Sequence, residues 1–184
     1  MRERASKAAR SLAGQLLVAH PALKDPNFRR TVVLMTTHNP EGAMGMVLNR
    51  PMHKKLAELG GDFALGVLSG VPLFQGGPVE GTQLILAAWR IQDQGFQLHL
   101  GIDPEKAGTL LGEEATHVRA FFGYSGWGAG QLEMELEHHT WIVADAPTDL
   151  FEQAGDVGLW RSVLREKGPE WRMLDDEPDH PESN

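Results

Sequence analysis

Polar, titratable and aromatic side chains concentrate in two stretches of the sequence, residues 25–50 and residues 123–139. The first stretch includes Asp25, Arg30, His38, Asn49 and Arg50, and the second includes Tyr124, Trp127, Gln131 and Glu135. Polar groups beside aromatic walls are the usual build of a site for a small molecule or a peptide. The sequence therefore predicts a polar, aromatic-walled cleft for a small ligand or a protein partner, formed by His38, Asn49, Arg50, Tyr124, Trp127, Gln131 and Glu135.

The same residues contain a candidate pair for acid–base chemistry. His38 with Glu135, or with Asp25, would combine two titratable groups whose pKa values a cleft can push apart. A turn histidine more often bonds a backbone carbonyl, and this interpretation is favoured. We therefore assign no catalytic residue, and an uncharacterised enzyme with a His–carboxylate pair is the second alternative function.

Other catalytic and metal-binding patterns are incomplete. The segment Gly123 to Trp127 lacks the closing glycine of a nucleophile elbow around Ser125. Glu135 and His138 supply one arm of a carboxylate-bridged metal site, which needs two such helices. The glycines of residues 123–130 match neither the Walker motif nor the G-x-G-x-x-G motif, the two common phosphate-binding sequences. The chain has no cysteine, which excludes thiol catalysis and Cys-ligated metals, so we expect no metal and no cofactor.

The elements that must position these residues are mostly strands. Residues 31–37 and 43–49 form a hairpin signal around a five-residue loop, residues 38–42. Both segments are apolar on successive residues, which predicts a sheet that is covered on both faces or curled. Further strands are expected over residues 15–19, 73–77, 82–89, 96–100, 117–123 and 141–145.

Helices are expected at both ends of the chain and between the strands. Asp103, Pro104 and Glu105 are typical of a helix N-terminus and predict a helix over residues 104–111. Residues 125–130 are expected to form a glycine-rich turn. The remaining predicted helices cover residues 1–13, 54–59, 131–138 and 157–167, the last with Asp156 as its cap.

The length of 184 residues fits one domain. We divide the chain into a basic N-terminal helix or arm (residues 1–13), a single domain (14–168) and an acidic, mobile tail (169–184).

The charges of the chain are unevenly distributed. Residues 1–10 carry a net charge of +3 and the tail carries −5. Because the total is −8, the body between them carries −6. An acidic body repels phosphate backbones, and no helix-turn-helix with a basic second helix is evident. Direct nucleic-acid binding is therefore disfavoured, although a DNA-binding transcriptional regulator remains the first alternative function.

The expected location is the cytoplasm. The basic start of the chain leads to no cleavage site of the signal-peptide type. The longest apolar stretches, such as Leu84 to Trp89, are far shorter than a membrane-spanning helix. We therefore expect no membrane association, and the partner is an unidentified small ligand or protein.

Three separated blocks of sequence resemble the bacterial YqgE/AlgH family. They are the segment from Leu16 to Pro51, the motif GGPVE at Gly76 to Glu80, and the segment GYSGWGAGQLEMEL at Gly123 to Leu136. The resemblance implies an α+β fold, a single domain in which a strongly bent, mainly antiparallel sheet like a flattened barrel is flanked by helices. The family carries a transcriptional-regulator label but has no settled activity, so it implies no catalytic residue. The chain departs from the family at Ser125, where alanine is usual.

Overall fold

The computed structural model describes residues 10–153, 155 and 157–172, in which nine strands join in one mixed sheet. The strands are β1 (Leu16–Ala19), β2 (Val32–Asn39), β3 (Gly42–Val47), β4 (Pro51–Lys55), β5 (Pro72–Gln75), β6 (Val79–Ile91), β7 (Phe96–Leu100), β8 (Thr116–Gly128) and β9 (Trp141–Ala144). The α-helices are α1 (Pro104–Leu111), α2 (Gln131–Glu137), α3 (Leu150–Gln153) and α4 (Val157–Lys167). Short 3-10 helices lie at η1 (Leu56–Leu59), η2 (Gly61–Phe63) and η3 (Pro169–Trp171).

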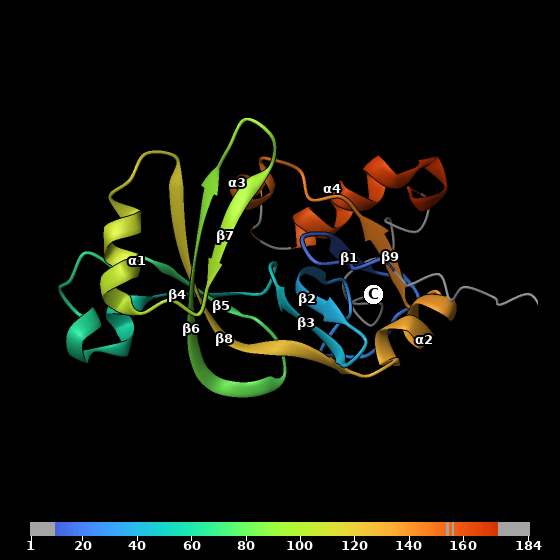
Figure 1. Ribbon diagram of the computed structural model, residues 1–184, viewed down its shortest axis with the longest axis horizontal. Coiled ribbons are helices and arrows are strands. Elements are labelled where there is room, and N and C mark those ends of the chain that lie inside the picture. Colours follow the sequence, from blue (N-terminus) through green and yellow to red (C-terminus); the bar gives the residue numbers. More distant parts are fainter. Residues whose placement is uncertain (1–9, 154, 156, 173–184) are drawn as a thin grey trace, which may run out of the picture.

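Strand β8 connects the two parts of the sheet. Its first part pairs antiparallel with β6 and parallel with β5, and its last residues pair antiparallel with β3. The order of strands is β4-β5-β8-β3-β2-β1-β9, and β6 lies beside β8 with β7 on its outer edge. Figure 1 shows β8 running from the part of the molecule that carries α1 to the part that carries α2. A single 13-residue strand therefore holds both parts in one sheet.

The sheet curls into a half-barrel because three of its strands contain irregularities. The register shifts between Met35 and Thr37 in β2, between Pro51 and Lys55 in β4, and between Val79 and Leu84 in β6. Such bulges bend a strand and increase its twist. The predicted fold class, a single α+β domain with a strongly bent, mainly antiparallel sheet, is confirmed, and the pairing of β5 with β8 is the parallel exception.

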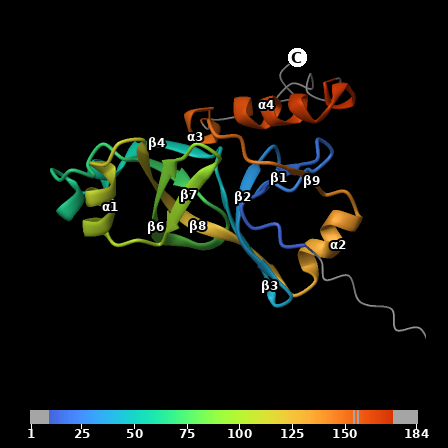
Figure 2. The same cartoon turned by 45° about the horizontal axis from the view of Figure 1, so that its top comes forward.

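Helices cover the curled sheet from several sides (Figure 2). Helix α1 packs on β6 and β8 over an apolar cluster that includes Ala107 and Leu110. Helix α4 lies against β1, where the Nε1 of Trp160 donates a hydrogen bond to the carbonyl of Ala19 at 2.8 Å. Helix α2 covers another apolar cluster, which contains Trp127 of β8 together with buried residues of β1, β2 and β3. Both faces of the first half of β2, residues 32–35, are buried, as its continuous apolar run predicts.

Most predicted elements are confirmed, and three have the predicted bounds, including helix α4 over residues 157–167. Strand β7 and helix α1 occupy residues 96–100 and 104–111, and the Oδ1 of Asp103 accepts the N–H of Lys106 at 2.8 Å as an N-cap. The hairpin of β2 and β3 is confirmed, but its strands extend through the predicted loop and leave only residues 40 and 41 between them. The reason is that His38 and Asn39 continue to pair with Ala43 and Gly42.

Three predictions of local structure are wrong. The glycine-rich turn over residues 125–130 is mostly strand, because the backbone from Ser125 to Gly128 pairs with β3. The helix over residues 54–59 is the end of β4 followed by the 3-10 helix η1. Of the helix over residues 1–13, residues 1–9 lie outside the described part and residues 10–13 are not helical.

The predicted tail begins as part of the folded domain. The ring of Trp171 meets the ring of His20 edge to face, with centroids 5.4 Å apart. Residues 173–184, the rest of the predicted mobile tail, lie outside the described residues, as does the predicted cap Asp156. Within the described residues, no helix combines the length and the hydropathy needed to cross a membrane.

Candidate functional site

Glu135 organises the aromatic side of the predicted cleft. One oxygen of its carboxylate, Oε2, accepts hydrogen bonds from the Nε1 of Trp127 and the Nε1 of Trp141, both at 2.8 Å. The other, Oε1, accepts a hydrogen bond from the Nε2 of Gln131 at 3.1 Å. Phe28 packs edge to face on Trp141, with ring centroids 5.5 Å apart. Three of the predicted site residues thus meet in one network, and they satisfy one another's hydrogen bonds.

The positions of these residues follow from β8 and α2. Trp127 pairs with Ala43 near the end of β8, and Gly130 then adopts a left-handed conformation with φ of 73° that starts the helix. Gln131 and Glu135 are four residues apart on α2 and therefore share one face of the helix. The Oε1 of Gln131 also accepts the N–H of Gly128 at 3.1 Å. This bond closes the connection between strand and helix.

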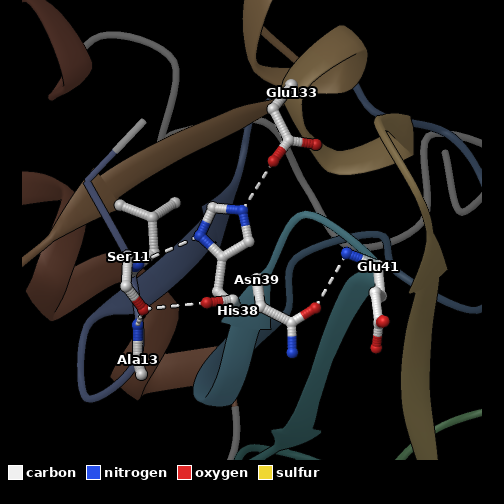
Figure 3. A network of polar contacts seen from close by, with 7 residues as sticks. Ser11, Ala13, His38, Asn39, Glu41 and Glu133 are labelled. Carbon is white, nitrogen blue, oxygen red and sulfur yellow. Dashed lines mark hydrogen bonds and ion pairs between the residues drawn. The ribbon is translucent and has the colours of Figure 1, made fainter. Parts of the chain in front are cut away.

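His38 lies at the tip of the β2–β3 hairpin and joins two other segments (Figure 3). Its Nδ1 accepts the N–H of Leu12 at 3.0 Å, and its Nε2 lies 2.7 Å from the Oε1 of Glu133. Because Nδ1 is an acceptor, Nε2 carries the proton and donates a hydrogen bond to the carboxylate of Glu133. The carbonyl of His38 also accepts a hydrogen bond from the hydroxyl of Ser11 at 3.1 Å. His38 therefore ties residues 11 and 12 to helix α2.

The carboxylate partner of His38 differs from both partners that the sequence indicated. His38 bonds Glu133, whereas Glu135 bonds the two indoles and Asp25 accepts the N–H of Asn27. The hydrogen bond from His38 is the largest cause of a lowered pKa of Glu133. Both ring nitrogens of His38 are engaged and its side chain is only 5% exposed. The arrangement supports a structural role for the imidazole more directly than proton transfer to a substrate.

The other predicted site residues lie at the opposite end of β3 or on the middle of β8. Asn49 is buried, and its amide accepts the N–H of Val32 at 2.9 Å and donates to the carbonyl of Arg30 at 2.8 Å. The guanidinium of Arg50 donates through Nη2 to the carbonyl of Arg29 at 2.9 Å. Tyr124 pairs with Val79 and packs on the large apolar cluster, which includes Leu16, Leu34, Trp89, Phe121 and Trp160. The seven predicted residues therefore fall into separate groups, of which the largest surrounds α2.

The structure contains an apolar cleft of about 520 Å³ that the sequence did not indicate. It lies between the β2–β3 hairpin and strand β7, which supply most of its lining. Its apolar lining consists of Leu34, Met35, Met44, Phe96, Leu98, Leu100 and Ala146. Gly14, Thr36, Thr37, Gln94 and Gly95 complete the lining. Phe96, Leu98 and Leu100 alternate with polar residues along β7, and this alternation is the sequence signal for the apolar wall.

Arg119 is a second feature that sequence reasoning missed. This buried guanidinium lies over the ring of Phe74 at 4.4 Å and near the rings of Trp89 and Phe151. Its Nη2 donates to the carbonyl of Phe151 at 2.7 Å. Burial lowers the pKa of Arg119 to about 10. The cation therefore anchors α3 to the sheet.

Alternative catalytic and metal sites gain no support from the geometry. Ser125 is fully buried, and its hydroxyl donates to the carbonyl of Gly76 at 3.2 Å. The Nδ1 of His138 bonds the carbonyl of Met134, one turn earlier. Among the residues that the structure describes, no three His, Asp or Glu side chains gather in an arrangement suited to a metal ion.

Comparison with known proteins identifies the family. The family model described as AlgH-like matches residues 16–172. The chain belongs to the AlgH-like family. A UPF0301 protein from Streptomyces coelicolor is 39% identical over 95% of this chain and 96% of its own length, and one from Chlorobium luteolum is 36% identical over the same shares. The predicted resemblance to the YqgE/AlgH family is thereby confirmed.

Two solved structures have the same fold. The solution structure of the AlgH protein from Pseudomonas aeruginosa has 26% sequence identity and a TM-score of 0.67, over 98% of this chain and 100% of that one. The crystal structure of a protein from Corynebacterium diphtheriae has 23% identity and a TM-score of 0.70, over 96% and 95% of the two chains. The AlgH-like fold therefore extends over nearly the whole chain.

Proposed function

We propose that this AlgH-like protein is a non-enzymatic, cytoplasmic regulatory protein that binds a small apolar molecule in the cleft between the β2–β3 hairpin and β7. The observation that carries the proposal is the cleft itself. Its volume of about 520 Å³ is in the usual range for small-molecule sites, and most of its lining is apolar. The proposal moves the ligand away from the polar network around Glu135, whose groups are already paired with one another.

The walls of the cleft suit an apolar ligand. Phe96, Leu98 and Leu100 are only half-buried although they face the large apolar cluster. A ligand that covers them removes apolar surface from water, which gains roughly 25 cal/mol for each Å² buried. Thr36 already donates its hydroxyl to the carbonyl of Met44, so this polar group on the wall is satisfied. Affinity would therefore come from apolar contact more than from hydrogen bonds.

One predicted site residue, His38, has a place in this proposal. Thr37, directly before it, and Gly14, close to its partner Leu12, both line the cleft. The N–H of Gly14 donates to the carbonyl of Met35 at 2.8 Å, so the segment around Gly14 forms one edge of the opening. His38 holds this edge in position, because its ring accepts the N–H of Leu12.

A thermal-unfolding experiment tests the proposal with three apolar probes: 1-octanol, indole and dodecanoate. A ligand that binds only the native state stabilises it by about 2.7 kcal/mol at a hundred times its dissociation constant. We expect at least one probe to raise the Tm of the wild type. Leu98→Glu, which places a charge in the cleft, should abolish the shift.

The matched control is Leu65→Glu. Leu65 is 97% exposed on the segment after η2, away from the cleft lining, so the same change of side chain leaves the cleft intact. Leu65→Glu should respond to the probes as the wild type does. An equal response of Leu98→Glu and the wild type would reject the cleft as the binding site.

A further inference from the structure

A second, polar cavity surrounds Arg50. It has a volume of about 150 Å³ and is lined by Pro26, Asn27, Val47, Arg50, Gln75, Gly77 and Pro78. The cavity is separate from the apolar cleft, because none of these residues lines that cleft.

Arg50 brings a positive charge to this cavity without a negative partner. Its Nη2 donates to the carbonyls of Arg29 at 2.9 Å and Pro26 at 3.4 Å, and no carboxylate of the described residues forms an ion pair with it. The nearest acid along the loop, Asp25, accepts the N–H of Asn27 at 2.8 Å. Partial burial of the guanidinium lowers the pKa of Arg50, with no nearby acid to oppose that effect.

Several hydrogen-bond donors in the cavity remain available. Two carbonyls hold Nη2 of Arg50, and its Nε and Nη1 donate to no other described residue. Asn27 and Gln75 are exposed, and within the described part their side-chain amides make no hydrogen bond. A guanidinium with an unused edge binds carboxylates and phosphates through two parallel hydrogen bonds. The two carbonyl contacts preorganise that edge.

We propose that the cavity around Arg50 binds an oxyanion, a carboxylate or phosphate group, through the free edge of the guanidinium and the side-chain amides of Asn27 and Gln75. The anion would supply the negative charge that the half-buried Arg50 lacks. The site is independent of the proposed apolar ligand, because the two cavities share no lining residue.

An NMR titration of the intact protein tests this site. Sodium phosphate and sodium acetate are the two probes, and sodium chloride keeps the ionic strength constant. We expect phosphate, acetate or both to shift the signals of Arg50 Nε–H and of the Asn27 and Gln75 side-chain amides. The more effective probe identifies the anionic group. If neither probe shifts these signals, or if the shifts lie elsewhere, the proposal is wrong.

Substitutions give a second test. Arg50→Met removes the charge and its donors, and should abolish the response to the effective anion. Arg90→Met is the matched control, because Arg90 pairs with Glu113 away from the cavity. Gln75→Ala retains Arg50 and removes one hydrogen bond to the charged anion, so binding should weaken by about tenfold. This variant also tests the site if Arg50→Met does not fold. Unchanged affinity in both Arg50→Met and Gln75→Ala would overturn the proposal.

Discussion

The Nε2 of His38 lies 2.7 Å from the Oε1 of Glu133, and this contact connects the tip of the β2–β3 hairpin to helix α2. The Nδ1 of the same ring accepts the N–H of Leu12, so a single imidazole holds three segments together. Gly14, two residues beyond Leu12, lines the apolar cleft. The contact between His38 and Glu133 is therefore part of the support for one edge of the cleft.

The stability supplied by Glu133 should depend on pH. Its pKa lies below the ordinary value of 4.5, chiefly because His38 donates a hydrogen bond to the carboxylate. A lowered pKa in the folded state stabilises the protein above the ordinary pKa, and this contribution is lost as the pH falls through the folded-state value. Urea unfolding at pH 7 should show the wild type to be more stable than Glu133→Gln. Below pH 4.5 the difference should shrink, and a difference that is constant with pH would contradict this account.

Replacing His38 should loosen the edge of the cleft locally. His38→Ala removes the acceptor of the Leu12 N–H and the donor to Glu133. Amide hydrogen exchange should become faster at Leu12 and Gly14, because the segment loses its attachment to the hairpin. His99→Ala, in β7, is the control and should leave exchange at these two amides unchanged. Equal protection in His38→Ala and the wild type would show that the imidazole does not hold this segment.

Glu135 should contribute more to stability than its partly exposed position suggests. Glu135→Ala leaves the indole N–H groups of Trp127 and Trp141 without their acceptor, and both rings are buried. An unsatisfied buried donor costs about 1–3 kcal/mol, so we expect a loss of about 2 kcal/mol or more in chemical denaturation. Glu135→Gln keeps an acceptor oxygen and should lose less. Glu137→Ala, an exposed change on the same helix, should have almost no effect, and equal losses for Glu135→Ala and Glu137→Ala would refute the role of the network.

Sequence reasoning identified the residue types of this network but not its pairings. Trp127, Gln131 and Glu135 were predicted to lie together, and they do. His38 was paired with Glu135 or Asp25, because the sequence does not show that β8 continues through Ser125 to Gly128. The glycines of this segment are typical of a turn, but glycine also allows two strands to approach closely. Gly42, which pairs with Gly128, is an example. A Cβ there would lie 2.4 Å from the carbonyl oxygen of Trp127, so the strands can approach only without a side chain.

Arg119 should be one of the most sensitive positions in the core. Arg119→Ala removes the hydrogen bond to the carbonyl of Phe151 and the cation over the ring of Phe74, and it leaves a cavity. Losses of this kind usually reach about 3 kcal/mol or more. Arg90→Ala, at an exposed ion pair, should cost less than about 1 kcal/mol. Equal effects of the two substitutions on urea unfolding would show that the buried cation contributes no special stability.

Arg119 and the apolar cleft are two features that the sequence could not predict. A charged residue within a strand usually faces solvent, so the sequence of β8 gave no reason to place the Arg119 side chain among Phe74, Trp89 and Phe151. The half-buried wall of β7 likewise depends on how far the β6–β7 hairpin stands from β2. That separation is set by the curl of the sheet, which long-range strand pairing determines. Composition and periodicity therefore predicted the elements and the fold class, but not the space between them.

The most direct test of the central claim is an NMR titration of the wild-type protein with 1-octanol. If the apolar cleft is the binding site, the backbone amide signals of Gly14, Thr36, Gly95 and Leu98 should shift with saturation. The indole N–H of Trp127 and the side-chain amide of Gln131 should keep their positions. Shifts confined to Trp127 and Gln131 would place the site in the polar, aromatic network instead and would contradict the account.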